Sequence, residues 1–360
     1  MRILFVGPGS NQKYGGGFFY ATHRRLVAGF TRAGHFVYPY SDRDTADYAF
    51  GVRALGRRLA NTRLVDIARD LQPDLLVLLL SYLITPDTIR RLREVVPHLK
   101  VAAISIDDIG HERPATQFRY LLACADIGFA TTGGATLARF ATERPVAFIP
   151  NPIDVSIDAG EAYATPREER QHDVLFACHQ PEVDPRWRFV ADLRQRLADL
   201  PLRWGLYGNF IDKPLKGDAY LRALAASAIG LSLNRRDGDL YASDRMAHFL
   251  GNGLLLATPR ASGYGAHFGD DEMLLFDRLD DLAAGIERAL GRGEPWRTMA
   301  AAGRRRALAT MEATSVCRFI ADLTLGRSPA ADWPFAAHIF TDRRPSAVTP
   351  PHSATAHGSA

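Results

Sequence analysis

The chain has 360 residues, of which 47% are hydrophobic and 23% charged, so it has enough apolar material for two globular domains of ordinary size. The 44 basic and 40 acidic residues nearly balance, and the basic runs lack interleaved aromatic residues, so a nucleic-acid partner is not indicated. The three cysteines lie far apart in apolar contexts, which argues against a disulfide framework or a zinc site.

Neither a secretion signal nor a membrane anchor is indicated. The apolar run after Arg2 is too short for the core of a signal peptide and is typical of a first β-strand. The longest apolar run, residues 75–80, is far too short to span a bilayer. We therefore expect a cytoplasmic protein, and the sequence is compatible with peripheral contact at the inner face of the membrane.

The first half of the sequence alternates short apolar strands with helices. Strands are expected at residues 2–6, 35–40, 75–80, 101–106, 127–130 and 146–149. Helices are expected at residues 18–33, 52–71, 86–95, 116–124 and 134–142. Continuously apolar strands are typical of a parallel sheet that is covered on both faces. We therefore predict a Rossmann-like, doubly wound α/β domain over residues 1–153.

A second α/β series follows a polar segment without periodicity, residues 154–173, which we interpret as a linker. Strands are expected at residues 174–177, 203–207, 229–233, 254–257 and 273–276. Helices are expected at residues 186–198, 218–226, 244–250 and 279–290, with long helical material over 296–323. We predict a second Rossmann-like domain over residues 174–325, whose last helices pack back on the first. Residues 343–360 are rich in Pro, Ser, Thr, Ala and His and are predicted to be disordered.

The segment 234–258 carries the clearest functional pattern. A polar loop begins at Asn234 and enters an expected helix at Ser243 and Asp244. Such a loop, at the carboxyl end of a strand and opening onto a helix N-terminus, is where α/β sheets bind anionic ligands. Arg245 would lie within reach of a phosphate, where a guanidinium stabilises the charge of a departing diphosphate without a metal. Helix capping is the alternative role for Ser243 and Asp244.

Two further residues of this segment are candidates for the same site. His248 lies three residues after Arg245 and therefore on the same face of the helix, although a purely structural histidine is the alternative. Gly253 precedes a strand, where a tight turn is the first expectation and close approach to a ligand the second.

Glycines and carboxylates follow two strands of the first half. Gly15 and Gly16 come after the first strand, and consecutive glycines let backbone N–H groups approach a phosphate or sugar; a flexible turn is the alternative. Asp107, Asp108 and His111 come after the strand 101–106, where Asp or His could deprotonate an acceptor hydroxyl. Adjacent carboxylates on an extended segment point to opposite sides, so only one is expected to face a cleft. A loop or helix-capping aspartate is the alternative.

The order of these pieces resembles a known architecture. Two Rossmann-like halves joined by a Pro-Asn-Pro-Ile-Asp segment look like the GT-B glycosyltransferases, and are similar to the bacterial "glycosyl transferases group 1" proteins akin to spore maturation protein CgeB. The segments that carry the resemblance are residues 72–78, 104–108, 125–154 and 243–253, and the match covers roughly residues 1–325. Where the family has S-x-R-x-x-E-x-x-x-x-G, this chain has His248 in place of the glutamate.

The resemblance implies a metal-independent transferase of the EC 2.4 class, without a cofactor, whose co-substrate is a nucleotide-diphosphate sugar. The second half would bind this donor and the first half a glycan, lipid-linked or other acceptor, with the two halves facing across a cleft. The family glutamate is expected to hold the donor ribose, a contact that His248 could keep. Basic residues near Gly208, here Lys213 and Lys216, would reach the phosphates, or form an exposed loop. Asp108 is the preferred acceptor-side residue.

The common role of such bacterial proteins is synthesis of envelope polysaccharide or glycoconjugates. Two other functions stay open: a GT-B-like sugar-nucleotide epimerase, and a non-catalytic sugar- or nucleotide-binding homologue, for which the change to His248 is the best support. No HExxH, paired CxxC or close aspartate cluster indicates a metal site. The donor, the acceptor, the stereochemistry and the oligomeric state do not follow from the sequence.

Overall fold

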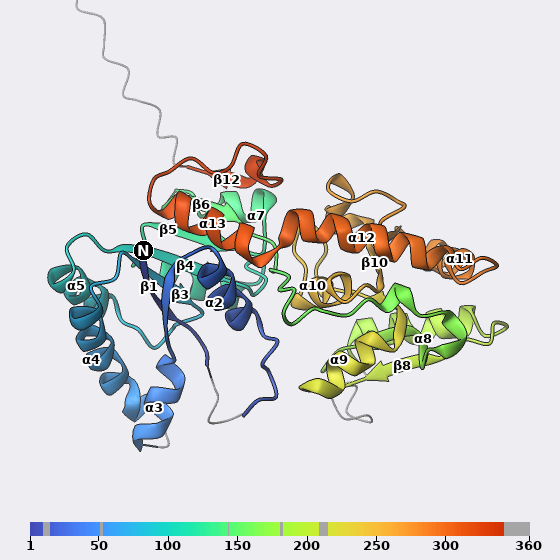
Figure 1. Cartoon of the computed structure of the whole chain (residues 1–360), viewed down its shortest axis with the longest axis horizontal. Coiled ribbons are helices and arrows are strands. Elements are labelled where there is room, and N and C mark those ends of the chain that lie inside the picture. The colour runs from blue at the N-terminus through green and yellow to red at the C-terminus, as the bar shows by residue number, and fades with distance from the viewer. Residues whose placement is uncertain (10–14, 51–52, 143, 181–182, 209–214, 342–360) are drawn as a thin grey trace, which may run out of the picture.

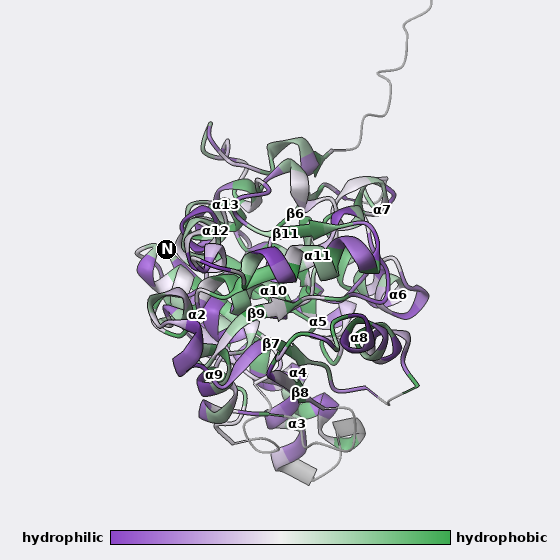
Figure 2. Ribbon diagram, turned by 90° about the vertical axis from the view of Figure 1, so that its right-hand side faces the viewer, coloured by the Kyte–Doolittle hydropathy of each residue, from purple (hydrophilic) through white to green (hydrophobic). Residues whose placement is uncertain are grey.

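The computed structural model describes residues 1–9, 15–50, 53–142, 144–180, 183–208 and 215–341. Within this part of the chain, two α/β units lie end to end along the long axis of the molecule (Figure 1). Each unit is built round its own sheet, and hydrophobic residues gather on the central strands while outer helices such as α8 are hydrophilic (Figure 2). Lys213 and the tail 343–360 lie outside the described residues.

The first sheet has seven strands in the order β12-β6-β5-β4-β3-β1-β2. They are β1 (Arg2–Val6), β2 (Phe36–Tyr40), β3 (Leu75–Leu79), β4 (Lys100–Ser105), β5 (Ile127–Ala130), β6 (Val146–Phe148) and β12 (Ile339–Phe340). Neighbouring strands are parallel except β12, which runs antiparallel to β6. The helices of this unit are α2 (Thr22–Arg32), α3 (Asp42–Phe50), α4 (Arg53–Leu71), α5 (Pro86–Val95), α6 (Glu112–Leu122) and α7 (Gly134–Ala138).

The strands of the first sheet are buried on both faces. Leu75 and Val77 of β3 belong to one apolar cluster, which continues onto α2, whereas Leu76 and Leu78 belong to a second cluster, which continues onto α4 and α5. Successive strand residues point to opposite faces, so two separate clusters require a helical layer on each side of the sheet. This is the doubly wound arrangement that the apolar strand pattern predicts.

The second sheet has five parallel strands in the order β11-β10-β9-β7-β8. They are β7 (His172–Ala177), β8 (Trp204–Tyr207), β9 (Ser227–Leu231), β10 (Leu255–Pro259) and β11 (Leu274–Phe276). The helices that follow these strands or close the chain are α8 (Pro185–Arg196), α9 (Asp218–Ala225), α10 (Asp244–Gly251), α11 (Leu279–Ala289), α12 (Pro295–Met311) and α13 (Ala313–Thr324).

The helical material predicted as one long segment over 296–323 is two helices. Extended backbone at Glu312 (φ −62°, ψ 136°) separates α12 from α13, and the Glu312 carboxylate accepts the N–H groups of Thr314 and Ser315. Ile153 exchanges two backbone hydrogen bonds with this break, both 2.8 Å long. Consequently α12 packs on the second unit, while α13 packs on α2 of the first (Figure 1).

One predicted helix start was wrong, and two elements were missed. Residues 15–20 form turns, so the first helix begins at Thr22 and not at residue 18. Helix α3 was missed because its sequence is polar and lacks a clear apolar stripe. The two-residue strand β12 was missed because so short an antiparallel pairing leaves no periodic signal, and it depends on residues far away in the chain.

Candidate active site between the two units

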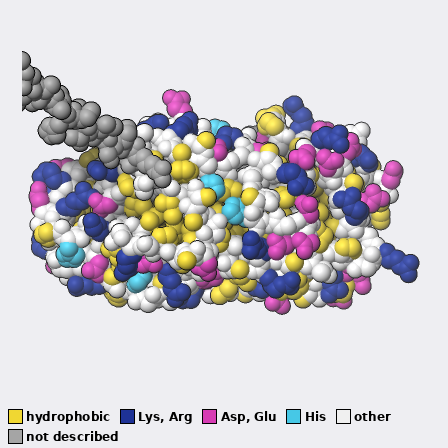
Figure 3. Space-filling model, turned by 90° about the horizontal axis from the view of Figure 1, so that it is seen from above, with side chains coloured by type: hydrophobic (Ala, Val, Ile, Leu, Met, Phe, Trp, Pro, Cys, Tyr) yellow, Lys and Arg dark blue, Asp and Glu magenta, His cyan; other side chains and the backbone are white. Residues whose placement is uncertain are grey.

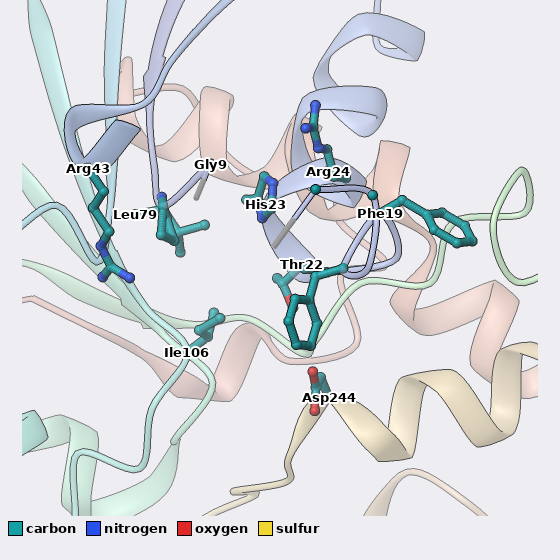
Figure 4. A pocket seen from close by; sticks show the side chains of 14 residues that line it. Gly9, Phe19, Thr22, His23, Arg24, Arg43, Leu79, Ile106 and Asp244 are labelled. Carbon is teal, nitrogen blue, oxygen red and sulfur yellow. The ribbon is translucent and has the colours of Figure 1, made fainter. Parts of the chain in front are cut away.

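A cavity of about 260 Å³ lies where the two units meet. Its walls come from the carboxyl ends of three parallel strands of the first sheet, at Pro8, Leu79 and Ile106, and from the start of α2. The second unit contributes Asp244 at the start of α10, which points into the cavity from the opposite side (Figure 4). Loops at the carboxyl edge of a parallel sheet are the usual place for ligands in such folds.

Gly15 and Gly16 line this cavity, so the structure brings them together with Asp244. A side chain at either glycine would meet open space, and Gly15 has a left-handed backbone (φ +53°). Packing therefore does not require glycine at position 16. The lack of a side chain there exposes the backbone to the cavity. The glycine loop also touches the second unit, because Gly217 donates its N–H to the carbonyl of Gly17 at 2.9 Å.

Three basic or titratable residues that the sequence analysis did not single out also line the cavity: His23, Arg24 and Arg43. His23 lies in the first turn of α2, a helix without a side-chain cap, and its Nε2 atom is buried with no partner among the described residues. Burial, with a smaller effect of Arg24, lowers the pKa of His23 to about 4, so the imidazole is neutral near pH 7. No motif flags His23 in the sequence, because only the fold places it at a cavity wall.

The loop before α10 is held by its first residue. The Asn234 amide donates to the Tyr241 carbonyl at 3.1 Å, and its oxygen accepts the Ser243 N–H at 3.4 Å. Ser243 occupies the N-cap position of α10, but its hydroxyl makes no capping bond and is buried without a partner among the described residues. The helix N-terminus therefore keeps donors available for an anionic ligand.

Arg245 lies at the carboxyl edge of the second sheet. Its guanidinium donates to the carbonyl of Ala177 at 3.0 Å and to that of Leu233 at 2.8 Å, which joins the ends of β7 and β9. Its Nε atom is buried and has no partner in the described part of the chain. The guanidinium near this strand end is thus fixed by two carbonyls and keeps Nε as a donor without a partner, but Arg245 does not line the cavity.

His248 is 2% exposed and does not line the cavity. Its Nδ1 atom lies 3.1 Å from the Tyr220 hydroxyl, and its ring packs edge-on against Tyr20 of the first unit. Burial, and then the nearby charges of Arg25 and Arg245, hold the pKa of His248 well below its usual value, so the ring is neutral. Because the ring is buried against Tyr20 and Tyr220, its proposed contact with the nucleotide sugar stays a prediction.

Other glycine and lysine candidates have local roles. Gly253 has φ +76°, and a Cβ atom there would lie 2.8 Å from the ring of Tyr163, so the turn needs glycine for backbone and packing reasons. Gly208 has φ +94°, which marks the tight turn after β8. Lys216 places its ammonium 5.5 Å from the ring centre of Phe18 in the first unit, a contact across the interface.

The adjacent carboxylates after β4 have different environments. Asp108 is 6% exposed and forms a two-pronged ion pair with Arg236 of the second unit, with contacts of 2.8 and 3.0 Å. It also accepts the Gly110 N–H at 2.8 Å, and His111 Nε2 lies 3.6 Å away. Asp107 instead lines a second cavity. As expected, only one of the two carboxylates lines a cavity, but it is Asp107. Asp108 instead pairs with Arg236 across the interface, and no sequence pattern predicts this ion pair.

Within the described ranges, no group of three or more His, Cys, Asp or Glu side chains converges as if to hold a metal ion. In the same part of the chain, no helix combines the length and the apolar character needed to cross a membrane. On the face seen in Figure 3, acidic and basic side chains are interspersed.

Comparison with known proteins gives a family model and several structures. Residues 185–322 match the model described as "Glycosyl transferase-like". HepE (Alr3699) of Anabaena, solved with UDP-glucose, has a TM-score of 0.55 at 12% identity, over 91% of this chain and 100% of that one. "Trehalose-6-phosphate from E. coli bound with UDP-2-fluoro glucose" has a TM-score of 0.54 at 14% identity, over 90% and 99%.

A putative UDP-N-acetylglucosamine 2-epimerase from Listeria monocytogenes has a TM-score of 0.50 at 10% identity, over 91% of this chain and 98% of that one. No curated protein matches the sequence. At such identities the structural likeness shows the fold, and it confirms the predicted GT-B architecture of two Rossmann-like units. Together with the glycosyl transferase-like match, this architecture supports a transferase.

Proposed function

We propose that this protein transfers a sugar from a nucleotide-diphosphate donor to an acceptor in the cavity between its two units. The observation that carries this proposal is the meeting of Gly15, Gly16 and Asp244 around one cavity at the carboxyl edge of the first sheet. The match of residues 185–322 to a glycosyl transferase-like model supports it. The HepE structure holds UDP-glucose, which supports a nucleotide sugar as the donor.

The donor diphosphate would bind at the start of α10. The Nε–H of Arg245 and the Ser243 hydroxyl are buried donors without a partner among the described residues, and the helix N-terminus adds N–H groups beside them. Asn234 fixes the loop that carries these groups. Negative charge that develops on the departing diphosphate would be stabilised by this preorganised group of donors. Asp244 would accept hydrogen bonds from sugar hydroxyls, and the glycine loop would close over the transferred sugar from the first unit.

Stabilisation by a fixed guanidinium and a helix N-terminus makes the proposed transfer independent of a metal. The acceptor, a glycan or a lipid-linked sugar, would enter from the first unit. By resemblance to CgeB-like proteins, we place the reaction in bacterial envelope or glycoconjugate synthesis, in the cytoplasm or at the inner face of the membrane. Asp108 and His111 stay proposed acceptor-side residues, although the ion pair of Asp108 with Arg236 must loosen for Asp108 to accept a proton.

A non-catalytic nucleotide-sugar binder is the second candidate, and His248 favours it because this buried residue stands where the resembling family has glutamate and does not line the cavity between the units. An epimerase would share the fold, as the Listeria structure shows for a putative epimerase.

Calorimetric titration of the wild type and of Arg245→Ala with nucleoside diphosphates, their sugar conjugates and the free nucleosides, in EDTA, tests the donor site. We expect the substitution to weaken diphosphate ligands about tenfold or more and to leave nucleoside binding nearly unchanged. An equal loss of affinity for diphosphate ligands and for free nucleosides would show that Arg245 does not bind the phosphates. Arg260→Ala, an exposed arginine at the end of β10 that pairs with Asp270 and Asp277, is the matched control.

A further inference from the structure

A second cavity, of about 560 Å³, adjoins the first at the carboxyl edge of the first sheet. Leu79 and Ile106 line the first cavity, and the next residues along the chain, Leu80 and Asp107, line the second. Arg43 lines both. A molecule held in the second cavity would therefore lie beside the proposed transfer site, on the unit expected to bind the acceptor.

The second cavity carries positive charge that its surroundings do not neutralise. Arg43 and Arg113 both line it, and neither forms an ion pair with a carboxylate among the described residues. Asp107 is the one carboxylate in the lining, so the charges of the lining side chains sum to about +1 at neutral pH. Burial raises the pKa of Asp107, and the two arginines oppose that effect.

Other groups in the wall suit an anion as well. The Tyr82 hydroxyl is buried and has no partner in the described part of the chain, and burial raises the pKa of Tyr82, so the group is a neutral donor. Arg113 and Pro114 belong to the first turn of α6, whose N-cap residue, His111, makes no side-chain capping bond. The first turn also holds Glu112, which is exposed and does not line the cavity. Helix N-terminal N–H groups add to a site for negative charge.

The wall of this cavity is fixed before any ligand binds. The Arg43 guanidinium donates to the carbonyl of Leu80 at 3.2 Å. Leu80 has a left-handed backbone (φ +49°), a conformation that is costly for a non-glycine residue and is often found where a ligand is held. The backbone N–H of Tyr82 returns to the same carbonyl at 3.1 Å. The strained turn thus holds Arg43 and Tyr82 beside each other.

From these contacts we infer that the acceptor carries a phosphate group, which Arg43, Arg113 and the Tyr82 hydroxyl bind in the second cavity. Planar guanidinium groups and a hydroxyl donor match the oxygens of a phosphate ester, and a neutral sugar would leave the arginines unpaired. The inference rests on the proposed transferase function. The acceptor hydroxyl would point past Arg43 into the first cavity, where the donor sugar is expected.

Two sources of this chemistry are distinguishable: a water-soluble sugar phosphate and a lipid-linked sugar phosphate. Thermal unfolding is recorded with inorganic phosphate, hexose 1- and 6-phosphates and the corresponding neutral hexoses. A parallel measurement uses phosphatidylcholine vesicles with and without a polyprenyl diphosphate sugar. Both positive results support the inference. Stabilisation by the soluble esters identifies a water-soluble sugar phosphate as the acceptor, and stabilisation only by vesicles that contain the polyprenyl diphosphate sugar identifies a lipid-linked one. No stabilisation by any phosphate, or equal stabilisation by neutral hexoses, overturns it.

The variants Arg113→Gln and Tyr82→Phe keep the size of each side chain while they remove charge or one donor. We expect Arg113→Gln to weaken binding of the stabilising phosphate about tenfold and Tyr82→Phe to weaken it severalfold. Arg119→Gln is the matched control, because Arg119 lies on the same helix and packs over the ring of Phe140. Unchanged phosphate binding in Arg113→Gln refutes the inference.

Hydrolysis of the nucleotide-sugar donor distinguishes a failure of this inference from a failure of the proposed function. Release of nucleoside diphosphate from the donor by water does not need the acceptor, so it is measured on the wild type without any phosphate ester and reports on the proposed function alone. A wild type that binds phosphate esters yet never turns over or binds a nucleotide sugar would contradict the proposed function alone.

Discussion

Replacement of Arg236 by Met tests whether the pair with Asp108 holds the two units together. In the structure Asp108 is 6% exposed and Arg236 27% exposed, so the two hydrogen bonds between them are largely shielded from water. A side chain at Gly110 would lie 2.3 Å from Arg236 Nε, which shows how closely the guanidinium packs there. Loss of the guanidinium leaves the Asp108 carboxylate buried with the Gly110 N–H as its remaining short contact. We expect a cost of about 2–4 kcal/mol.

Urea unfolding of the wild type, Arg236→Met, Asp108→Asn and the double variant measures the coupling between the two side chains. The expected coupling is about 1.5–3 kcal/mol, because each single change removes the same interaction. Arg235→Met is the control: Arg235 pairs with Gln180 and Asp184 inside the second unit and is 55% exposed. Additive effects within about 0.5 kcal/mol would show that Asp108 and Arg236 do not stabilise each other across the interface.

The same variants test the proposed acceptor-side role of Asp108. If Asp108 serves only to join the units, Arg236→Met and Asp108→Asn should reduce turnover to a similar degree. If Asp108 accepts the acceptor proton, Asp108→Asn should abolish turnover while Arg236→Met retains most of it.

Three further expectations concern stability. Gly253→Ala should cost about 2–3 kcal/mol in urea unfolding, because φ is +76° and the Cβ would lie 2.8 Å from the Tyr163 ring; nucleotide affinity should not change. Tyr220→Phe should cost about 1 kcal/mol through loss of the contact with His248, and a stability equal to wild type would show that the 3.1 Å contact contributes nothing. Burial alone would raise the pKa of Asp173, but hydrogen bonds from two arginines outweigh it and lower that pKa to about 2. Since the folded pKa lies below the unfolded one, Asp173 contributes about 2 kcal/mol above pH ~4, which is lost as the pH falls towards 2; Asp173→Asn should remove this dependence from acid unfolding curves.

The sequence was sufficient for the two-sheet architecture because the evidence for it is local. Continuously apolar strands such as 75–80 and the alternation with helices can be read without knowing any contact. The strand-loop-helix pattern around Arg245 was likewise visible, and the structure puts this residue at a strand end. The helical material over 296–323 was predicted without a break, because nothing in its composition marks the one at Glu312, which the contact with Ile153 accompanies.

The parts of the site that the sequence did not reveal depend on tertiary contacts. Arg236 meets Asp108 over a separation of 128 residues, and His248 meets Tyr20 from the other unit. Neither pair forms a recognisable sequence motif, because its two residues lie far apart in the chain. His23 and Arg43 likewise become cavity residues only when three strand ends and the helices α2, α3 and α10 come together. Burial of His248 could not be foreseen either, since its place on the face of Arg245 suggested a ligand contact.

Release of nucleoside diphosphate from a panel of UDP-, GDP-, ADP- and dTDP-sugars, in EDTA and with chromatographic analysis of the sugar product, tests the proposed transferase most directly. We expect one donor to be consumed, with free sugar or a glycosylated product and the matching nucleoside diphosphate appearing in equal amounts, and we expect Arg245→Ala to slow this release at least tenfold. A nucleotide sugar that binds but is never consumed, or one that is only converted to its epimer, would contradict the proposed transferase function.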